Sequence, residues 1–456
     1  MSKQTTVAFV SLGCAKNLVD SEKMLGQLAE AGCALTNEES EADVIVINTC
    51  GFLEASRREA VEVIAEAVEQ KRTGRCGRVV VAGCLVQRDG EALLREVSGI
   101  DALVGVNNRD DVVRAVLNRP ATPARAADVY LSEYHPFVQI DTARLRLTPV
   151  HYAYLRISEG CNQKCTFCTI PSIRGPMHCK PPQVVLAEAR ELLADGAVEL
   201  NLIGQDTTSY GEEFAEPYGL DGLLRLLNEV DGLEWLRLMY VYPSVMTEAI
   251  IDAVAECDRV VKYIDIPLQH INDRVLKAMH RRVTRRQTEE LLARLRSRIP
   301  GVRIRTTMIA GFPGETDEEF AELVRFVRDF RFDALGVFAY SLEPDTPAGR
   351  MRDQVPETVK RERVEALMLA QQEVAFEIAD VSVGRTFRVL VDGFDEDGLA
   401  VGRHAGQAPE VDGVTYVRGG DVEPGHFVTV RCTGRRDYDL IGVPTTVALP
   451  VVPAAR

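Results

Sequence analysis

Three closely spaced cysteines constrain this chain more than any other sequence feature. Cys161, Cys165 and Cys168 follow a short apolar segment, residues 152–157, and a Ser-Glu-Gly turn. Three thiolates at this spacing can bind three irons of a cubane cluster and leave the fourth iron open, because an all-cysteine cluster site needs four. Two alternatives stay open at this point: a zinc site with His178 as the nearest fourth ligand, or three small buried apolar side chains.

Length and composition indicate a multidomain globular protein. The 456 residues suffice for about two to four domains, and 46% are hydrophobic and 27% charged. No apolar run is long enough to span a bilayer and the N-terminus lacks a secretory signal, so we expect a cytoplasmic protein without membrane contact. In that reducing compartment the eleven cysteines indicate ligands, redox groups or buried thiols.

The charge balance is acidic, with 53 Lys and Arg against 68 Asp and Glu and a formal net charge of -15. Nucleic-acid-binding proteins usually carry a basic surface. The composition therefore favours a basic protein partner and argues against nucleic acid as the primary substrate.

Residues 5–120 alternate between strand-like and helix-like patterns. Short β-branched runs predict strands at 7–10, 44–47, 79–82 and 102–104, and helical spacing predicts helices at 18–31, 55–70 and 90–97. This order predicts an α/β domain with a parallel, doubly wound sheet.

A cysteine follows each of the first three predicted strands: Cys14, Cys50 and Cys84. The carboxyl ends of parallel strands line one edge of an open sheet, where ligands bind. We therefore expect these thiols to converge and to bind a second cubane cluster with an open iron. Any one of them could be a buried thiol, but their equivalent positions in successive units favour ligation for all three.

Residues 121–146 are expected to be a linker, with a short hairpin near Tyr152. From 147 to 380, strands are predicted near 153–157, 199–204, 235–240, 262–268, 303–310 and 334–340, with helices such as 183–194, 247–257, 284–298 and 317–330 between them. Six such units predict a partial (β/α)6 TIM-type barrel whose site lies at the carboxyl ends of the strands. A long helix at 359–378 is expected to lead out of the barrel.

Residues 381–448 alternate apolar and polar residues between glycine turns, which predicts a small OB-like all-β barrel. Between residues 385 and 439 this segment has seven Arg and no Lys against ten acidic residues, a net charge of -3. We expect it to bind a partner rather than to act only as a stabilising cap.

Polar residues also follow the second and fourth barrel strands. The candidates are Gly204, Gln205, Asp206, Asp265, Gln269 and His270. Without the cysteines, Asp206 would indicate only an Asx-capped turn, and His270 would indicate a structural histidine. The sequence GFPGET at 311–316 could cradle an anion at a helix start, but its acidic residues favour a shaped loop.

Five further cysteines have no partner at ligand spacing. Four are expected to be structural: Cys33, Cys76, Cys257 and Cys432. Cys179 lies closer to the cysteine motif and has no defined role.

The motif CNQKCTFC, with Phe167 before the last cysteine, resembles that of the radical S-adenosylmethionine enzymes. In that superfamily the open iron of a [4Fe-4S] cluster binds S-adenosylmethionine and reductive cleavage yields a 5′-deoxyadenosyl radical. The resemblance implies that Cys161, Cys165 and Cys168 hold this cluster. It implies a set of residues that contact S-adenosylmethionine: Phe167, Gly204, Gln205, Asp206 and Gln269.

From about residue 5 to 448 the chain resembles the methylthiotransferases, which combine a three-cysteine domain, a radical core and a TRAM domain. The segments SLGCAKNLVDSE, NTCGF, YLRISEGCNQKCTFCTIPSIRG and YIDIPLQHIND are most similar to the RimO family, which modifies a small-subunit ribosomal protein (S-twelve). Relatives that modify tRNA carry a QSG-type sequence in place of Gln269-His270. In HCKPP, residues 178–182, relatives show Ser-Arg-Pro, and Lys180 keeps the charge.

This resemblance implies two [4Fe-4S] clusters and S-adenosylmethionine as cofactors. The radical abstracts hydrogen from the β-carbon of a substrate aspartate, the cluster on Cys14, Cys50 and Cys84 presents sulfur, and a second S-adenosylmethionine supplies the methyl group. The implied partners are a basic ribosomal protein, free or within the ribosome, and an electron donor such as flavodoxin or ferredoxin. The cysteines are cofactor ligands, and no protein residue is predicted as a catalytic acid or base.

Two other functions remain to be weighed. A tRNA adenosine methylthiotransferase shares the chemistry, but the Gln269-His270 pair and the acidic C-terminal barrel oppose it. A non-catalytic iron–sulfur or zinc protein that docks on the ribosome would cleave no S-adenosylmethionine and would tolerate loss of one cysteine set.

Overall fold

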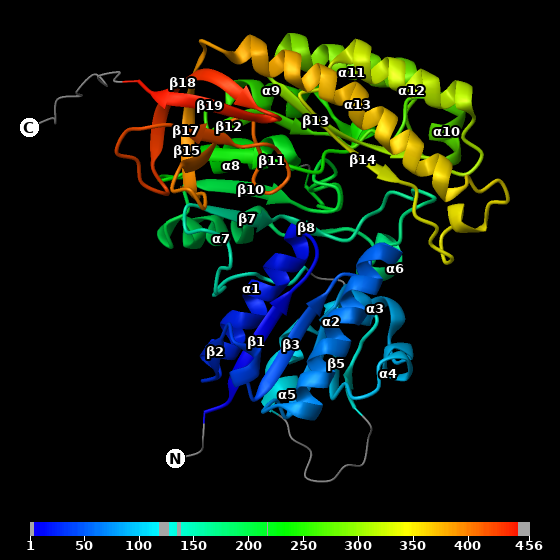
Figure 1. Ribbon diagram of the computed structural model, residues 1–456, viewed down its shortest axis with the longest axis vertical. Helices are drawn as coiled ribbons and strands as arrows, with labels where there is room; N and C mark the ends of the chain where they lie inside the picture. The colour runs from blue at the N-terminus through cyan, green and yellow to red at the C-terminus, as the bar shows by residue number, and fades with distance from the viewer. Residues whose placement is uncertain (1–3, 118–126, 135–137, 217, 446–456) are drawn as a thin grey trace, which may run out of the picture.

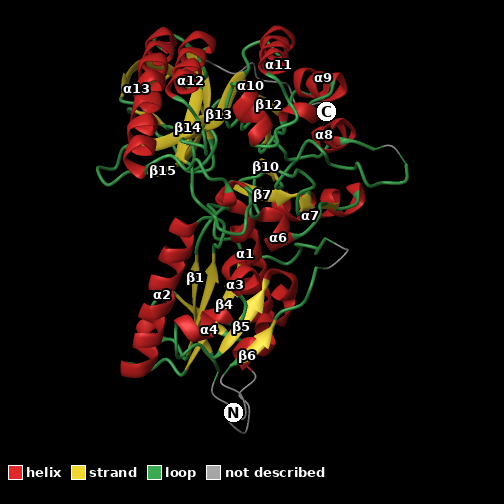
Figure 2. Cartoon of the chain, turned by 90° about the vertical axis from the view of Figure 1, so that its right-hand side faces the viewer, coloured by secondary structure: helices red, strands yellow, loops and turns green. Residues whose placement is uncertain are grey.

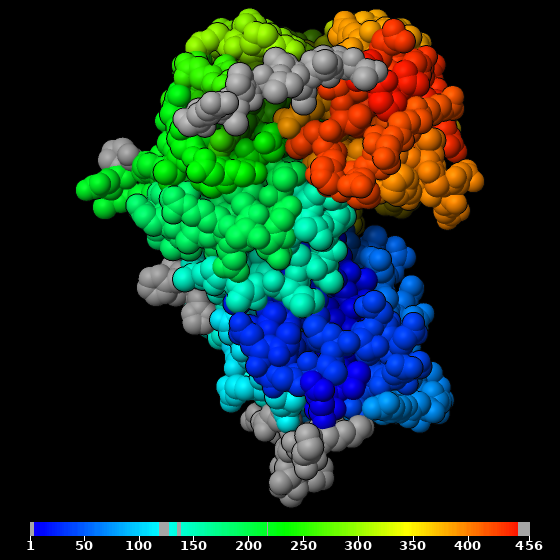
Figure 3. Space-filling view, turned by 90° about the vertical axis from the view of Figure 1, so that its left-hand side faces the viewer, coloured from blue at the N-terminus to red at the C-terminus, as the bar shows by residue number. Residues whose placement is uncertain are grey.

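A computed structural model describes residues 4–117, 127–134, 138–216 and 218–445. It contains an N-terminal unit, a central core and a small C-terminal barrel, and the barrel lies beside the core with the N-terminal unit below it (Figures 1 and 3). Among the helices of these described segments, none is both long and apolar enough to cross a membrane.

The N-terminal unit is a parallel sheet, as predicted, and has six strands where four were expected, in the order β2-β1-β3-β4-β5-β6. Its strands are β1 (Thr6–Ser11), β2 (Ala34–Thr36), β3 (Val44–Thr49), β4 (Arg78–Gly83), β5 (Ala102–Gly105) and β6 (Asp128–Tyr130). The β-branched runs of β3 and β4 are buried throughout, because helices cover both faces of the sheet. The strand order reverses between β1 and β3, which makes that point the ligand-binding crevice of such a sheet.

Within the described part of this unit, α-helices flank the sheet, and Figure 2 shows α1 to α4 beside its strands. The helices are α1 (Ala15–Glu30), α2 (Glu54–Thr73), α3 (Cys84–Asp89), α4 (Ala92–Glu96) and α5 (Val112–Leu117). Side chains of α1 and α5 pack on one face and those of α2, α3 and α4 on the other. Helices α3 and α5 and strands β2 and β6 were not predicted, and β6 extends the sheet into the range expected to be a linker.

The central core is an open six-stranded parallel sheet in the order β14-β13-β12-β11-β10-β7, the partial barrel that the sequence predicted. Its strands are β7 (Tyr152–Arg156), β10 (Glu199–Ile203), β11 (Trp235–Leu238), β12 (Val260–Asp265), β13 (Arg303–Ala310) and β14 (Ala334–Ala339). The predicted hairpin near Tyr152 is wrong, because β7 pairs in parallel with β10. A short antiparallel pair instead joins β8 (Ser158–Glu159) to β9 (His178–Cys179).

Helices cover the outer face of the core sheet, where leucine, isoleucine and valine side chains form the largest apolar cluster. They are α7 (Pro182–Ala194), α8 (Leu220–Asn228), α9 (Glu248–Glu256), α11 (Arg285–Arg298) and α12 (Asp317–Phe330), with α6 (Ile170–Arg174) and α10 (Asp273–Ala278) in the loops. Thr284 and Thr316 begin α11 and α12 with capping boxes that satisfy the first amides of each helix.

Helix α13 (Glu357–Ser382) runs along β14 and α12 and leads into the C-terminal barrel (Figure 1). That barrel closes from β15 (Thr386–Phe394), β16 (Ala400–His404), β17 (Thr415–Val417), β18 (Phe427–Arg436) and β19 (Asp439–Pro444). Arg403 of β16 bonds Glu199 of the core at 2.7 Å, and Glu410 accepts hydrogen bonds from the hydroxyls of Tyr152 and Tyr154. Part of the barrel's negative charge therefore faces the core.

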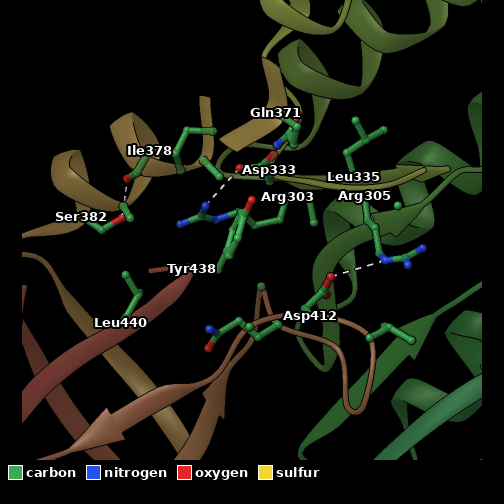
Figure 4. Close-up of a pocket in the computed structure, with 18 of the residues that line it drawn as sticks. Arg303, Arg305, Asp333, Leu335, Gln371, Ile378, Ser382, Asp412, Tyr438 and Leu440 are labelled. Carbon is green, nitrogen blue, oxygen red and sulfur yellow. Dashed lines mark hydrogen bonds and ion pairs between the residues drawn. The ribbon is translucent and has the colours of Figure 1, made fainter. Parts of the chain in front are cut away.

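A cavity of about 330 Å³ lies between the C-terminal barrel, α13 and the β13–β14 edge (Figure 4). Its charged groups are paired: Arg303 with Asp333 at 3.1 Å, and Arg305 with Asp412 at 3.4 Å. No cysteine lines this cavity, so it is separate from both cysteine sets.

Candidate functional site

The first cysteine set, Cys161, Cys165 and Cys168, lies on the loop between β8 and α6. Thr166 fixes this loop, since its amide donates to Met279 O at 3.1 Å and its hydroxyl to Ala278 O at 2.8 Å. Phe167 packs into a small apolar cluster with Met279, Phe312 and Tyr340. In this structure the aromatic residue of the motif therefore anchors the loop that carries the thiols.

The thiols of this set influence one another's charge. Burial raises the pKa of Cys161 and of Cys168 to about 12, and the neighbouring Cys165 acts in the same direction on both. Cys165 Sγ lies 3.7 Å from Arg281 Nη1 and 3.9 Å from Tyr242 Oη. An arginine beside a thiolate offsets the charge that metal binding creates when the thiol proton is released.

A single zinc ion is a poor fit to this set. Within the described segments, no group of three or more His, Cys, Asp and Glu side chains converges on one metal-ion position. His178, the suggested fourth ligand, is 2.8 Å from Glu213 and stacks on Tyr134. Three neighbouring thiols that do not converge on one metal-ion position suit a cubane cluster, because each cysteine there binds a different iron.

The second set, Cys14, Cys50 and Cys84, lies at the carboxyl ends of β1, β3 and β4, beside the point where the strand order reverses. Glycines allow the three loops to approach. Gly13 has φ +94°, and a Cβ there would lie 2.8 Å from Cys50 Cβ. Gly83 has φ +95°, and a Cβ there would lie 2.2 Å from Asn48 Oδ1. The glycine beside each of these cysteines was a usable sequence signal.

Burial raises the pKa of Cys84 to about 12, although Arg174 opposes the shift and donates to Cys84 Sγ at 3.2 Å. Cys14 and Cys50 both raise the pKa of Cys84 further. Cys14 is exposed and Cys50 half-buried, so this set opens towards solvent on one side. Arg174 comes from α6, directly after the first cysteine set.

A buried ion network joins the two cysteine sets. Arg174 bonds Asp20 of α1 at 2.9 Å and Glu159 of β8 at 3.0 Å, and Arg156 bonds the same two carboxylates. Asp141 extends the network to Arg156 at 2.7 Å. Burying charges is tolerated only where each has partners, so this network fixes the N-terminal unit against the core.

Two further contacts hold the units together. Thr169 Oγ1 donates to Phe52 O at 3.0 Å. Glu343, from the loop after β14, accepts from the Glu54 amide at 2.9 Å and pairs with Arg88 at 2.8 Å. The loops carrying the two cysteine sets are thereby braced against each other.

The loop after β11 reaches both sets. Tyr242 approaches Cys165, and the ring of Tyr240 lies under the ammonium of Lys16, two residues after Cys14. Tyr240 has φ +59°, a left-handed conformation that is uncommon outside glycine and is concentrated at functional sites. Burial lowers the pKa of Lys16 to about 8, and Cys14 and Asp265 oppose that shift.

The predicted S-adenosylmethionine-binding residues differ in what they already contact. Asp206 accepts from Thr208 N, Ser209 N and Gln163 Nε2, the bonds of a capped turn. A Cβ on Gly204 would lie 2.4 Å from the Ser158 hydroxyl, so this position requires close approach.

Two of the predicted residues have free hydrogen-bonding capacity. The side-chain oxygens of Gln205 and Gln269 are buried without a hydrogen-bond partner, while Gln205 Nε2 donates to Glu159 at 2.7 Å. Gln269 also has a left-handed φ of +73° and bridges to β13. Buried orphan acceptors are rare, and these fit a ligand that carries an ammonium or hydroxyl donor.

Other sequence candidates have structural partners. His270 Nδ1 accepts from the Asn272 amide at 3.0 Å, and its ring is fully buried. Glu315 closes the GFPGET turn by accepting from Gly311 N and pairing with Arg363. Cys179 is buried and accepts from Gly211 N at 3.3 Å.

Sequence reasoning missed the charged and aromatic residues that surround the thiols. They are Lys16, Arg174, Tyr240, Tyr242 and Arg281. Each lies in a loop or near a helix end, and its three-dimensional neighbours are distant in sequence, so nothing in its local pattern indicates them.

Three family models match the chain. They are the radical SAM superfamily over residues 155–327, the uncharacterized protein family UPF0004 over residues 6–105, and the TRAM domain over residues 383–444. Each model falls on one of the three structural units.

Curated relatives match over nearly the full length. A protein of Anaeromyxobacter sp. (strain K) is 46% identical over 99% of this chain and 97% of its own length, and one of Geobacter sulfurreducens is 43% identical over 96% and 98%. Both are named ribosomal protein uS12 methylthiotransferase RimO.

Among solved structures, the radical S-adenosylmethionine methyltransferase TsrM from Kitasatospora setae matches with a TM-score of 0.56. The match covers 76% of this chain and 74% of that one at 17% identity, which shows a shared fold. Full-length relatedness above 40% identity decides the family. This chain is a member of the RimO methylthiotransferase family, within the radical SAM superfamily.

Proposed function

We propose that this methylthiotransferase modifies the β-carbon of an aspartate in ribosomal protein uS12 and uses the two cysteine sets for different steps. The observation that carries the proposal is the placement of two separate three-cysteine sets against each other, one at the carboxyl end of the core barrel and one at the switch point of the N-terminal sheet. The name of the full-length relatives supports the substrate.

In this proposal Cys161, Cys165 and Cys168 hold the [4Fe-4S] cluster of the radical core. When bound there, the cluster supplies the electron that cleaves S-adenosylmethionine and so provides the radical needed to activate an aliphatic C–H bond. Gln205 and Gln269 offer their buried carbonyl oxygens to the cofactor, and Phe167 holds the cysteine loop in place. Gly204 and Asp206 shape the same strand end.

Cys14, Cys50 and Cys84 would hold a second [4Fe-4S] cluster as the sulfur carrier, and a second S-adenosylmethionine would supply the methyl group. Arg174 supports this role by placing a positive charge on Cys84 Sγ while it is anchored to the core through Glu159. An electron donor such as flavodoxin or ferredoxin would deliver the reducing equivalents.

We place the functional units at residues 5–130, 147–380 and 381–448, with β6 moved from the predicted linker into the first unit. The first would carry the sulfur, the second would generate the radical, and the TRAM barrel would dock the basic substrate protein.

The test is an anaerobic reaction. The protein is reconstituted with iron and sulfide, given S-adenosylmethionine and reductant, and offered uS12 and an anticodon stem-loop in parallel. Mass spectrometry is expected to find a methylthio gain on an aspartate of uS12. A gain on the RNA alone would contradict the substrate assignment, and the absence of deoxyadenosine would contradict the radical assignment.

A further inference from the structure

Lys16 is a buried cation without a counter-ion. It is the second residue of α1, its side chain is only 7% exposed, and its Nζ lies 2.9 Å from the centroid of the Tyr240 ring. Among the described residues, the ammonium makes no hydrogen bond and no ion pair. The ring offers a cation–π contact, which is weaker than an ion pair and does not replace a carboxylate.

The carboxylates nearest to Lys16 are already bound by arginines. Asp265 pairs with Arg305 at 2.9 Å and accepts from the Tyr240 amide at 3.1 Å. Glu159 pairs with Arg156 at 2.6 Å and with Arg174 at 3.0 Å. The protein therefore surrounds this ammonium with acids whose bonding is satisfied, and a buried, unpaired charge costs several kcal/mol.

Lys16 also lies where the two cysteine sets face each other. It follows Cys14 by two residues, and the residue beneath it, Tyr240, is two residues from Tyr242, which contacts Cys165. The ammonium therefore projects from the N-terminal unit onto a loop of the core that touches the first cysteine set.

The side-chain carboxylate of an aspartate is bonded directly to the β-carbon, the carbon that reacts. A cation fixed between the radical-generating set and the sulfur-carrying set can therefore bind that carboxylate and hold the β-carbon between them. We propose that Lys16 is the residue that binds the side-chain carboxylate of the substrate aspartate, and so positions the β-carbon and selects aspartate over asparagine. This inference rests on the proposed function.

Two other roles for Lys16 predict different results. If it offset the charge of a cluster on Cys14, its loss would lower the iron content of the N-terminal unit. If it bound the carboxylate of S-adenosylmethionine, its loss would raise the KM for S-adenosylmethionine and leave the affinity for the protein substrate unchanged.

The test is a double-mutant cycle between enzyme and substrate. Reconstituted wild-type enzyme, Lys16→Met, Lys16→Arg and the control Lys23→Met are each measured for equilibrium binding to uS12 and to uS12 with the modified aspartate replaced by asparagine. Lys23 is on the same helix and donates to Thr142 O, away from the cysteines. Iron content, deoxyadenosine formation and the KM for S-adenosylmethionine are recorded for every variant.

Wild-type and Lys23→Met proteins should bind the aspartate substrate about 10- to 100-fold more tightly than the asparagine substrate, the range of one charged hydrogen bond. Lys16→Met should lose that preference, keep its iron and its KM for S-adenosylmethionine, and form deoxyadenosine with little product. Lys16→Arg should regain part of the preference.

An undiminished preference in Lys16→Met overturns the inference, as does a loss of iron or a raised KM for S-adenosylmethionine with the preference intact. If wild-type enzyme modifies no aspartate of uS12, the proposed function fails first and this inference falls with it. If wild-type enzyme modifies uS12 and Lys16→Met still prefers the aspartate substrate to the asparagine substrate, only the inference about Lys16 is wrong.

Discussion

At the scale of single residues, small side chains decide whether the second cysteine set can form. The three thiols come from loops 36 and 34 positions apart in sequence, yet Cys14 and Cys50 both act on the charge of Cys84. Gly13 makes that approach possible because its left-handed backbone and missing Cβ leave room for Cys50.

Replacing Gly13 with alanine should remove the second cluster selectively. The new Cβ would meet Cys50 Cβ at 2.8 Å, in addition to a backbone cost of about 1 kcal/mol for a left-handed alanine. We expect about four irons per reconstituted chain to be lost, with cleavage of S-adenosylmethionine retained. Iron analysis and deoxyadenosine assay measure the two effects.

Gly32→Ala is the matched control, because Gly32 has φ +83° and its added Cβ meets nothing within 4 Å. It should carry the same backbone cost and keep all its iron. Equal iron contents in the two variants would show that Gly13 does not shape the cluster site.

The grouping of six cysteines into two sets was predictable because their spacing and their positions after strands follow from chain topology; that they bind clusters stays a prediction. The residues around them were not, because a contact such as that of Arg174 with Cys84 joins positions 90 residues apart. Nothing in the local pattern of Lys16 shows that its nearest acids are already paired. Asp206 is the opposite case. The sequence predicted that it contacts S-adenosylmethionine, but its carboxylate already accepts the backbone hydrogen bonds of a turn.

At the scale of elements, the carboxyl ends of strands carry the two cysteine sets and the C-terminal barrel braces the other end of the core. The periodic patterns of the long strands and helices predicted nearly all of them, since burial on both faces of a parallel sheet leaves β-branched runs. Short elements such as β2, β6 and α3 escaped prediction because three to six residues hold too little periodicity.

His404, at the end of β16, makes the docking of the C-terminal barrel sensitive to acid. Burial, aided by Arg303 and Arg237, lowers the pKa of His404 to about 3. Its Nδ1 accepts from the Gly406 amide at 2.9 Å, and the ring stacks on Phe387. In the unfolded chain this histidine takes up a proton near pH 6.5, which the folded protein excludes.

The pKa of His404 is lower in the folded protein than in the unfolded chain. Its contribution to the free energy of unfolding is therefore fully present above about pH 6.5 and is lost as the pH drops towards 3. Below about pH 5.5 the free energy of unfolding should fall by roughly 1.4 kcal/mol per pH unit through this group alone, and by about half that slope near pH 6.5. His404→Asn should show a shallower dependence in denaturant titrations. His426→Asn, at an exposed site, should match wild type, and parallel slopes for all three proteins would refute this role.

At the scale of the whole molecule, buried charge holds the two cysteine sets in one arrangement. Burial alone would raise the pKa of Asp141, but Arg156, Lys180 and Arg109 together hold it well below its usual range. These three cations come from the core and the N-terminal unit, so one carboxylate ties the two units together.

Asp141→Asn should lower the free energy of unfolding by about 3–5 kcal/mol, because it keeps the shape and leaves three buried cations short of a counter-ion. Denaturant unfolding of the reconstituted protein provides the measurement. The exposed pair of Glu69 and Arg72 is the control, and Arg72→Ala should leave the free energy of unfolding nearly unchanged because water screens that pair. Similar losses in both variants would contradict the role of the network.

The most direct test of the two-set account compares Cys50→Ala with Cys161→Ala on the same uS12 substrate. We expect Cys50→Ala to form deoxyadenosine without methylthiolated product, and Cys161→Ala to form neither. Mass spectrometry of uS12 and of deoxyadenosine reads both outcomes in one reaction. Full methylthiolation by Cys50→Ala, or deoxyadenosine from Cys161→Ala, would contradict the assignment of separate steps to the two sets.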